Sequence, residues 1–126
     1  KLGISERVEF LGQIEGVEKQ KLLADAHWTI MPSHSENFGI VVLESLAQST
    51  PVAASFGTPW RILEEQNVGR WTDNSPAALA ATIDEVLSIP DSEYDELRSR
   101  CRGFVEDRFD ITQNIKHWLN LYSKLK

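Results

Sequence analysis

The sequence predicts an α/β protein with a partial, doubly wound parallel sheet and a helical C-terminal tail. Short apolar segments alternate with segments of helical periodicity between about residues 6 and 73, which is typical of strands joined by crossover helices. From about residue 75 onward the periodicity is helical throughout. The length of 126 residues fits one domain, and we expect residues 1–126 to form it.

Each expected element of the first half has a local signal. Gly12 ends the first apolar segment, Pro32 ends the second, and Pro51 separates a long apolar segment from the strand that follows it. That long segment is apolar on nearly every side, which indicates a buried helix. We expect strands at residues 7–12, 28–31, 52–55 and 69–72, and helices at residues 17–26, 38–48 and 59–66.

Three helices are expected after residue 75. Ser75 followed by Pro76 is an N-cap residue before a proline at the first helical position, and Pro90 lies beyond the end of that helix. Ser92 with Asp95 resembles a capping box for the next helix, and Asp110 with Gln113 opens the last one. The apolar residues of the last helix recur at the helical period and are therefore expected in the core: Ile115, Trp118, Leu119, Tyr122 and Leu125.

Composition and charge exclude several functional classes. The net charge of -6 disfavours nucleic acid as a partner, because binding phosphates needs clustered Lys and Arg. The longest low-charge stretch, residues 38–57, contains Glu44 and Pro51 and is not a membrane span. The single cysteine, Cys101, can form no internal disulfide, which is compatible with a reducing cytoplasm, and we expect it to be a partly buried apolar side chain. The chain begins with Lys1 rather than Met, so we expect it to be a piece of a longer protein.

The most informative segment is the polar loop at residues 33–37 with the start of the helix after it. In doubly wound sheets, ligands bind at the carboxyl ends of the strands. A helix N-terminus at that edge offers free N–H groups and the positive end of the helix dipole to a phosphate. Gly39 has no side chain to block the approach of that phosphate, and Asn37 is a suitable helix cap.

Two carboxylates flank this helix start. Glu36 precedes it, and Glu44 is the only charged residue between Phe38 and Gly57. At ~1.5 Å per residue, Glu44 lies about 7–8 Å beyond Gly39, which is roughly the length of a diphosphate. Two interpretations of this spacing remain open. The carboxylates bind hydroxyl groups at the two ends of a diphosphate, or Glu36 is solvated and Glu44 pairs with a Lys or Arg.

Residues 35–44 (SENFGIVVLE) resemble the Glu-x7-Glu motif of the family 4 glycosyltransferases, which have the GT-B fold. The segment that ends at Gly12, the strand before Pro32, the PVAAS string at 51–55, Gly57 and Gly69 follow in the family's order. By this resemblance the chain is the C-terminal, Rossmann-like, nucleotide-sugar-binding half of a GT-B enzyme, incomplete at its N-terminus. The first two strands of that half and the acceptor-binding N-terminal domain are then missing.

The resemblance implies a retaining glycosyltransferase that moves a sugar from a nucleotide-diphosphate sugar to a glycan or lipid-linked acceptor. It implies that Glu36 is the catalytic residue that holds hydroxyls of the donor sugar, and that Glu44 binds the ribose. No metal ion or cofactor is expected, because a helix dipole and basic side chains would meet the charge of the leaving diphosphate. The other donor-binding positions that it implies are Asn37, Phe38, Gly39 and Ile40 at the helix start, and Gly12, Gln13 and Ile14 against the base.

The chain departs from the family pattern at two places. Residues 48–50 (QST) stand where small residues and a glycine are usual, and residues 57–61 (GTPWR) replace a Gly-Gly pair with its acidic residue. The GTPW string resembles a subgroup associated with bacterial surface polysaccharides, whereas Trp60 and Trp71 themselves are expected to pack in the core or an interface. His34 is expected to be a solvated loop residue, because no second ligand lies at a metal-binding spacing.

Two alternatives stay open: a nucleotide-sugar epimerase on the same fold, and a non-catalytic binding module that kept the fold. The four expected strands correspond to strands 3, 4, 5 and 6 of a family sheet with the order 3-2-1-4-5-6. The strand at 28–31 would then have an open edge, through which two chains could associate. The expected location is the cytoplasm, with the full-length protein at the surface of the inner membrane as a further alternative.

Overall fold

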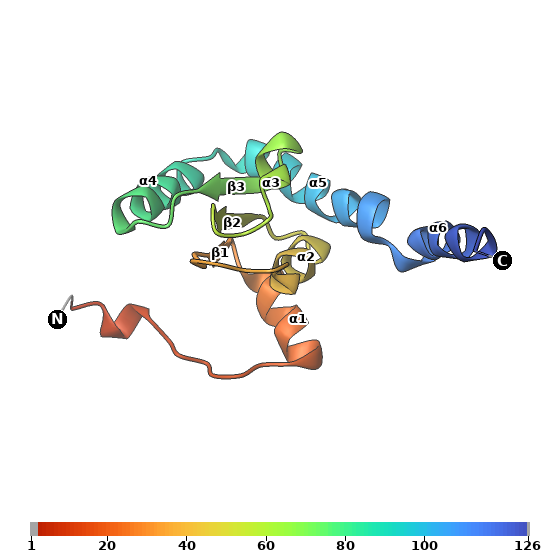
Figure 1. Ribbon diagram of the computed structural model, residues 1–126. Coiled ribbons are helices and arrows are strands. Elements are labelled where there is room, and N and C mark those ends of the chain that lie inside the picture. Colours follow the sequence, from red (N-terminus) through yellow and green to blue (C-terminus); the bar gives the residue numbers. More distant parts are fainter. Residues whose placement is uncertain (1–2, 126) are drawn as a thin grey trace.

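A three-stranded parallel sheet forms the centre of the protein (Figure 1). The computed structural model describes residues 3–125. The strands β1 (Thr29–Met31), β2 (Val52–Ser55) and β3 (Gly69–Thr72) lie in the order β1-β2-β3, with Ile30 beside Ala53 and Ala53 beside Arg70. The predicted α/β fold with a partial parallel sheet is confirmed, and the bounds of β2 and β3 agree with the prediction to the residue.

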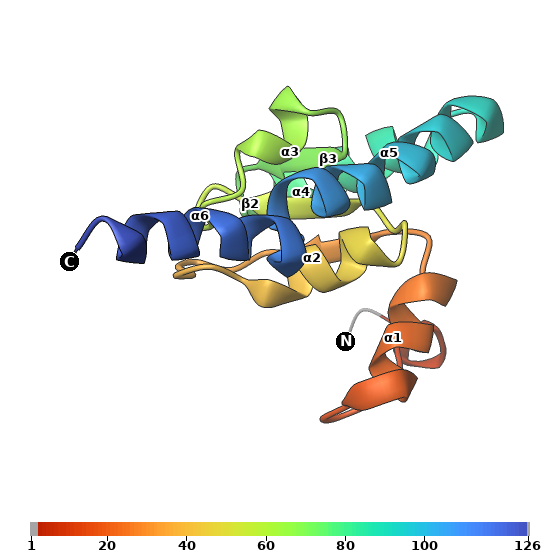
Figure 2. The same ribbon diagram turned by 90° about the vertical axis from the view of Figure 1, so that its right-hand side faces the viewer.

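The described residues form six α-helices: α1 (Gly16–Asp25), α2 (Ile40–Ala47), α3 (Ile62–Glu65), α4 (Pro76–Leu87), α5 (Asp91–Phe109) and α6 (Ile111–Ser123). Figures 1 and 2 show α2 lying along α5, with α1 beyond α2 and α4 on the far side of β3. A short 3-10 helix, η1 (Ser5–Arg7), lies near the N-terminal end. None of the helices described between residues 3 and 125 is long and apolar enough to traverse a bilayer.

The core lies between β2, α2, α3 and α5. All four residues of β2 are buried, because they are small or β-branched and lie under helices on a central strand. Cys101 of α5 is also fully buried and donates from Sγ to the carbonyl oxygen of Leu97 at 3.2 Å. This burial raises the pKa of its thiol to about 12, so Cys101 acts as an apolar core residue, buried more deeply than expected.

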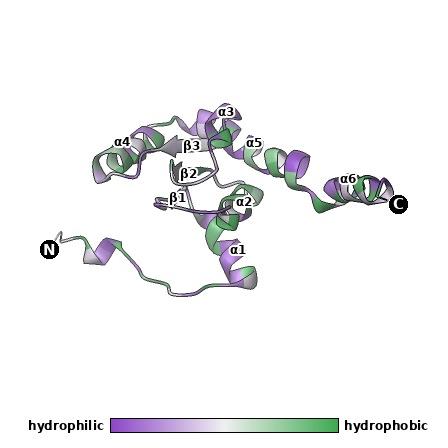
Figure 3. Cartoon of the chain, viewed as in Figure 1, coloured by the Kyte–Doolittle hydropathy of each residue, from purple (hydrophilic) through white to green (hydrophobic). Residues whose placement is uncertain are grey.

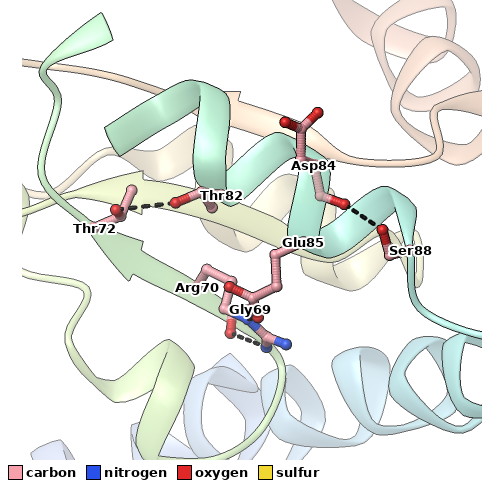
Figure 4. A network of polar contacts seen from close by, with 7 residues as sticks. All are labelled: Gly69, Arg70, Thr72, Thr82, Asp84, Glu85 and Ser88. Atoms are coloured by element: carbon pink, nitrogen blue, oxygen red, sulfur yellow. Dashed lines mark hydrogen bonds and ion pairs between the residues drawn. The ribbon is translucent and has the colours of Figure 1, made fainter. Parts of the chain in front are cut away.

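Polar contacts fix α4 to β3 (Figure 4). Arg70 of β3 forms an ion pair with Glu85 of α4 at 2.7 Å, and the hydroxyl of Thr82 donates to that of Thr72 at 3.0 Å. The predicted cap of α4 is present, since Ser75 Oγ accepts from the N–H of Ala78 at 3.4 Å. This helix thereby covers the strand that ends the sheet.

The predicted start of α5 is wrong, whereas that of α6 is confirmed. Helix α5 begins at Asp91 with Pro90 as its N-cap, because the carbonyl of Pro90 already accepts from the N–H of Tyr94 at 2.9 Å. Ser92 therefore lies inside the first turn and caps nothing. Helix α6 begins after Asp110, whose Oδ1 accepts from the N–H of Thr112 at 2.6 Å.

The strand predicted at residues 7–12 is absent. After η1, residues 8–15 run as an irregular segment away from the sheet (Figure 1), and Phe10 is 95% exposed. A strand is stable only when its N–H and C=O groups pair with a neighbour, and no described strand lies at the free edge of β1 to receive it. The segment therefore keeps its apolar side chains without a sheet to bury them.

The burial predicted for α6 is also wrong. The helix projects beyond the end of α5 (Figure 1), and its ribbon alternates between hydrophobic and hydrophilic residues (Figure 3). Its apolar face is exposed, because α6 packs mainly against α5 and little of the described body lies over that face. Trp118, for example, is 56% exposed. The predicted core residues that are all exposed are Ile115, Trp118, Leu119, Tyr122 and Leu125.

Candidate functional site

The loops after β1 and β2 meet at the carboxyl edge of the sheet, where the sequence places the candidate site. The loop after β1 spans residues 32–39, and the loop after β2 spans residues 56–61. Two hydrogen bonds hold the β1 loop: the N–H of Glu36 donates to the carbonyl oxygen of Gly57 in the β2 loop at 2.9 Å, and Oγ of Ser55 in β2 donates to the carbonyl oxygen of Ser33. The β1 loop is thus held by β2 and its loop.

Gly57 allows this close approach because it has no side chain. A Cβ at this position would lie 2.2 Å from the carbonyl oxygen of His34, far inside contact distance. His34 itself is exposed, as expected for a loop histidine, and its Nδ1 lies 3.1 Å from Nδ2 of Asn74 in the loop after β3. Loops from all three strands therefore converge around His34.

Helix α2 begins at Ile40, two residues later than predicted, with Gly39 as its N-cap. Gly39 has φ +76°, a left-handed conformation that side-chain-bearing residues rarely adopt. A Cβ on it would lie 2.7 Å from Cε of Met31 and 3.2 Å from Cγ of Glu36. These two side chains fill the space that a Cβ on Gly39 would take, and the approach of a phosphate to the backbone of Gly39 stays a prediction.

Asn37 is not the cap of α2, contrary to the prediction. Its backbone N–H donates to Oε1 of Glu36 at 3.0 Å, and α2 has no side-chain cap. Gly39 takes the cap position because its left-handed φ turns the chain into the helix. The first hydrogen bond of α2 runs from the N–H of Val42 to the carbonyl oxygen of Gly39, at 2.9 Å.

The start of α2 therefore presents unused hydrogen-bond donors. The N–H groups of Ile40 and Val41 precede the first closed turn and have no backbone acceptor within the described residues. They add to the positive end of the helix dipole at the carboxyl edge of the sheet. The arrangement suits an anion, as the sequence predicts.

Glu44 lies one turn further along α2 and forms an ion pair across to α1. Its Oε1 lies 2.7 Å from Nζ of Lys19, so Glu44 has the basic partner that one of the two interpretations predicted. Its other oxygen, Oε2, is buried and has no hydrogen-bond partner within the described part of the chain. A buried carboxylate oxygen without a donor is costly, and a ligand hydroxyl would relieve that cost.

A hollow of about 570 Å³ lies between the N-terminal segment, α1 and α2. Gly12 and Ile14 line it together with Lys19 and Val41, so the structure brings two predicted base-contacting residues close to α2. Gln13 is not part of this lining, and its Nε2 donates to Oε1 of Glu15 at 2.5 Å. Lys19 connects the hollow to Glu44.

The structure gives Glu36 a local role only. Its side chain accepts the Asn37 N–H and packs beside Gly39. Between residues 3 and 125, no group of three His, Cys, Asp or Glu side chains is placed to hold a metal ion. The catalytic role of Glu36, the ribose contact of Glu44 and the donor contacts of the other predicted residues stay predictions.

Sequence reasoning missed the residues that hold the β1 loop. Ser55, Gly57 and Trp60 each bind a backbone group of residues 33–38. The GTPW string was visible as a departure from the family pattern. The sequence did not show that this string contacts the β1 loop, which lies more than twenty residues earlier in the chain.

Residues 1–104 match the family model described as glycosyl transferases group 1. An uncharacterised glycosyltransferase of Methanocaldococcus jannaschii is 38% identical over 89 residues, which cover 69% of this chain and 23% of that protein. A D-inositol 3-phosphate glycosyltransferase of Salinispora tropica is 30% identical over 125 residues, which cover 98% of this chain and 26% of that protein. The chain thus spans about a quarter of the length of these relatives.

Two solved structures share this fold. Sucrose-phosphate synthase from Thermosynechococcus elongatus has a TM-score of 0.82 and 29% identity, over 97% of this chain and 31% of that one. HepE of Anabaena, solved in complex with UDP, has a TM-score of 0.82 and 25% identity, over 97% of this chain and 34% of that one. The similarity to both structures agrees with the predicted α/β fold of a Rossmann-like half.

Proposed function

The chain belongs to the group 1 glycosyl transferases, and we propose that residues 1–126 are the nucleotide-sugar-binding half of a retaining enzyme, incomplete at the N-terminus. The observation that carries this proposal is the start of α2. Unused N–H groups lie there at the carboxyl edge of a parallel sheet, with Glu36 before them and Glu44 after them. The complex of the similar HepE with UDP supports a nucleoside diphosphate as the ligand.

In this proposal the diphosphate of the donor lies against the N-terminus of α2. The N–H groups of Ile40 and Val41, with the helix dipole, stabilise the negative charge that grows on the leaving diphosphate. A helix terminus is fixed in place before the reaction, so it needs no reorganisation as the charge develops. Together with basic side chains from outside this chain, as the family resemblance implies, the helix terminus then meets the charge without a metal ion on the donor side.

Glu36 and Glu44 hold the two hydroxylated ends of the donor. Glu44 accepts hydrogen bonds from the ribose through the oxygen that has no partner in the described residues, and the ion pair with Lys19 orients the carboxylate. Glu36 lies beside Gly39, so a sugar attached to the diphosphate comes within its reach. The hollow lined by Gly12 and Ile14 receives the base.

The acceptor is a glycan or a lipid-linked sugar, by the resemblance of the GTPW string to enzymes of bacterial surface polysaccharide synthesis. Such an enzyme works in the cytoplasm, at the inner membrane where the acceptor is lipid-linked. An assay with lipid-linked and soluble glycan acceptors tests this part of the proposal separately from donor binding.

We predict different kinetic effects for the two carboxylates. In the full-length protein, Glu44→Gln should raise KM for the nucleotide sugar by about tenfold or more, because a hydrogen bond to a charged group contributes roughly 1.5–3 kcal/mol to the ground state and the transition state alike. Glu36→Gln should mainly lower kcat, because this residue lies beside the reacting sugar. Steady-state kinetics with varied donor concentration measures both effects.

Glu106→Gln is the matched control. Glu106 forms an ion pair with Arg102 at 2.8 Å, much like that of Glu44 with Lys19, but on the exposed surface of α5. Its substitution should leave both constants unchanged. If Glu36→Gln and Glu44→Gln change KM and kcat in the same way, the two carboxylates do not divide the work as proposed.

A further inference from the structure

Trp60 is the buried aromatic residue that ends the GTPW string. Its side chain is 2% exposed and lies in the core cluster with α2 and α5. Its indole N–H donates to the carbonyl oxygen of Phe38, the residue immediately before Gly39. A core residue therefore binds the backbone immediately before Gly39, the N-cap of α2, where the donor site is proposed.

Two contacts from the loop after β2 fix the β1 loop at two points. The carbonyl of Gly57 accepts from the N–H of Glu36 at 2.9 Å, and Trp60 donates to the carbonyl of Phe38. The peptide between Phe38 and Gly39 carries both that carbonyl and the N–H of Gly39. Because a peptide group is planar, the bond to Trp60 also sets the direction of this N–H.

The ring of Trp60 makes separate contacts that do not involve its N–H. Its centroid lies 5.2 Å from that of Phe38 and 6.0 Å from that of Phe109 at the end of α5. These contacts belong to ordinary aromatic packing in the core. The packing and the hydrogen bond can therefore be separated by a substitution that keeps a ring and removes the N–H.

We propose that Trp60 is a positioning residue of the donor site: its indole N–H holds the Phe38 carbonyl, so that the N–H groups that follow point to the diphosphate. This inference rests on the proposed function, because it takes the start of α2 as the place where the diphosphate binds. It also gives a physical role to the sequence that replaces the family's Gly-Gly pair. In this chain, a tryptophan of the core fixes the β1 loop from the side that faces the core.

The test is Trp60→Phe in the full-length protein, with UDP and a nucleotide sugar as probes. We expect the Kd for UDP and the KM for the nucleotide sugar to rise by about fivefold, the equivalent of one neutral hydrogen bond of roughly 1 kcal/mol. We expect kcat at saturating donor to change less. Calorimetry with UDP and steady-state kinetics give these values.

Trp71→Phe is the matched control, since Trp71 also donates from its indole to a backbone carbonyl, that of Thr58, at 3.2 Å. Thr58 is held independently by two bonds to the carbonyl of Ser55, from its N–H at 3.0 Å and from Oγ1 at 2.7 Å. The control likewise removes one indole hydrogen bond to a backbone carbonyl and should leave UDP binding unchanged, while thermal unfolding measures the stability of both variants. This comparison separates a loss of stability from a loss of positioning.

Three outcomes decide the matter. If Trp60→Phe weakens UDP binding and Trp71→Phe does not, the positioning role is supported. If both variants bind UDP as well as the parent protein, Trp60 only packs in the core and the inference is wrong while the proposed function stands. If the parent protein binds none of the three nucleotides UDP, GDP and ADP, the proposed donor site itself is wrong, and the results for the variants do not matter.

Discussion

Two glycines set the geometry of the candidate site at the level of single residues. Gly57 lets the carbonyl of His34 approach the β2 loop, and Gly39 turns the chain into α2 in a left-handed conformation. The sequence identified Gly39 as a special position, but for the approach of a phosphate. The structure adds a second requirement, because Met31 and Glu36 fill the space that a side chain would take.

We predict that Gly39→Ala lowers the free energy of unfolding by about 1–3 kcal/mol, because the left-handed φ is unfavourable for alanine and the new methyl group meets Met31. Urea unfolding of the chain measures the change. The control is Gly103→Ala in α5, where a Cβ meets nothing within 4 Å. There alanine should stabilise the helix by about 0.5–1 kcal/mol. Equal effects at both positions would contradict the strain assigned to Gly39.

The pairing of Glu44 shows how far sequence reasoning reaches at this scale. Its apolar surroundings on α2 indicated that this carboxylate needs a partner, and a Lys or Arg was one of two interpretations. The partner is Lys19, which is 25 positions away and comes close only because α1 packs against α2. Packing between helices is not encoded in a local pattern, so the identity of the partner could not be predicted.

Among the elements, those with their own local signals were predicted best. Strands β2 and β3 were predicted to the residue, and the caps at Ser75 and Asp110 were correct, because turn residues and caps act over three or four positions. The strand expected at residues 7–12 failed, because a strand also needs a neighbour. The period of α6 was correct, but its burial depends on a surface that the described residues do not provide.

Helix α6 offers a direct test of this description. We predict that the paired substitution Trp118→Gln with Leu119→Gln changes the unfolding free energy of the chain by no more than ~0.5 kcal/mol per site, as for exposed residues elsewhere. Leu97→Ala in α5, at a buried position, should cost about 2–5 kcal/mol. Urea denaturation followed by circular dichroism compares them. A loss above ~2 kcal/mol for the α6 variant would mean that its apolar face is covered in the folded chain.

At the scale of the whole molecule, the sheet ends abruptly at β1. Among the described strands, β1 pairs only with β2. The other edge of β1 is open, because residues 8–15 form no strand. Under the proposed function, the two further strands of a GT-B donor half would fill that edge. They would also give residues 8–15 a sheet to join. Self-association through the open edge stays a prediction.

Under the proposed function, the parts of the enzyme that lie outside this chain also bear on activity. Within the described residues, no ion pair or hydrogen bond brings a Lys or Arg side chain to residues 33–40, where the diphosphate is proposed to bind. A helix terminus alone contributes roughly 0.3–1 kcal/mol toward an anion at an exposed site, which supports only weak binding. An acceptor site is also needed for transfer, and the relatives that this chain matches are about three to four times as long.

We therefore predict that the isolated 126-residue chain has no measurable transferase activity, even where it binds a nucleoside diphosphate weakly. The measurement is an assay of the purified chain with a panel of nucleotide sugars and glycan acceptors, beside the full-length protein as the positive control. Circular dichroism must first show that the chain is folded, so that a lack of activity reflects missing parts. Robust transfer by the folded chain would show that the sheet edge, the basic side chains and the acceptor domain assigned to the missing region are dispensable, and the assignment of this chain as a donor half would then be wrong.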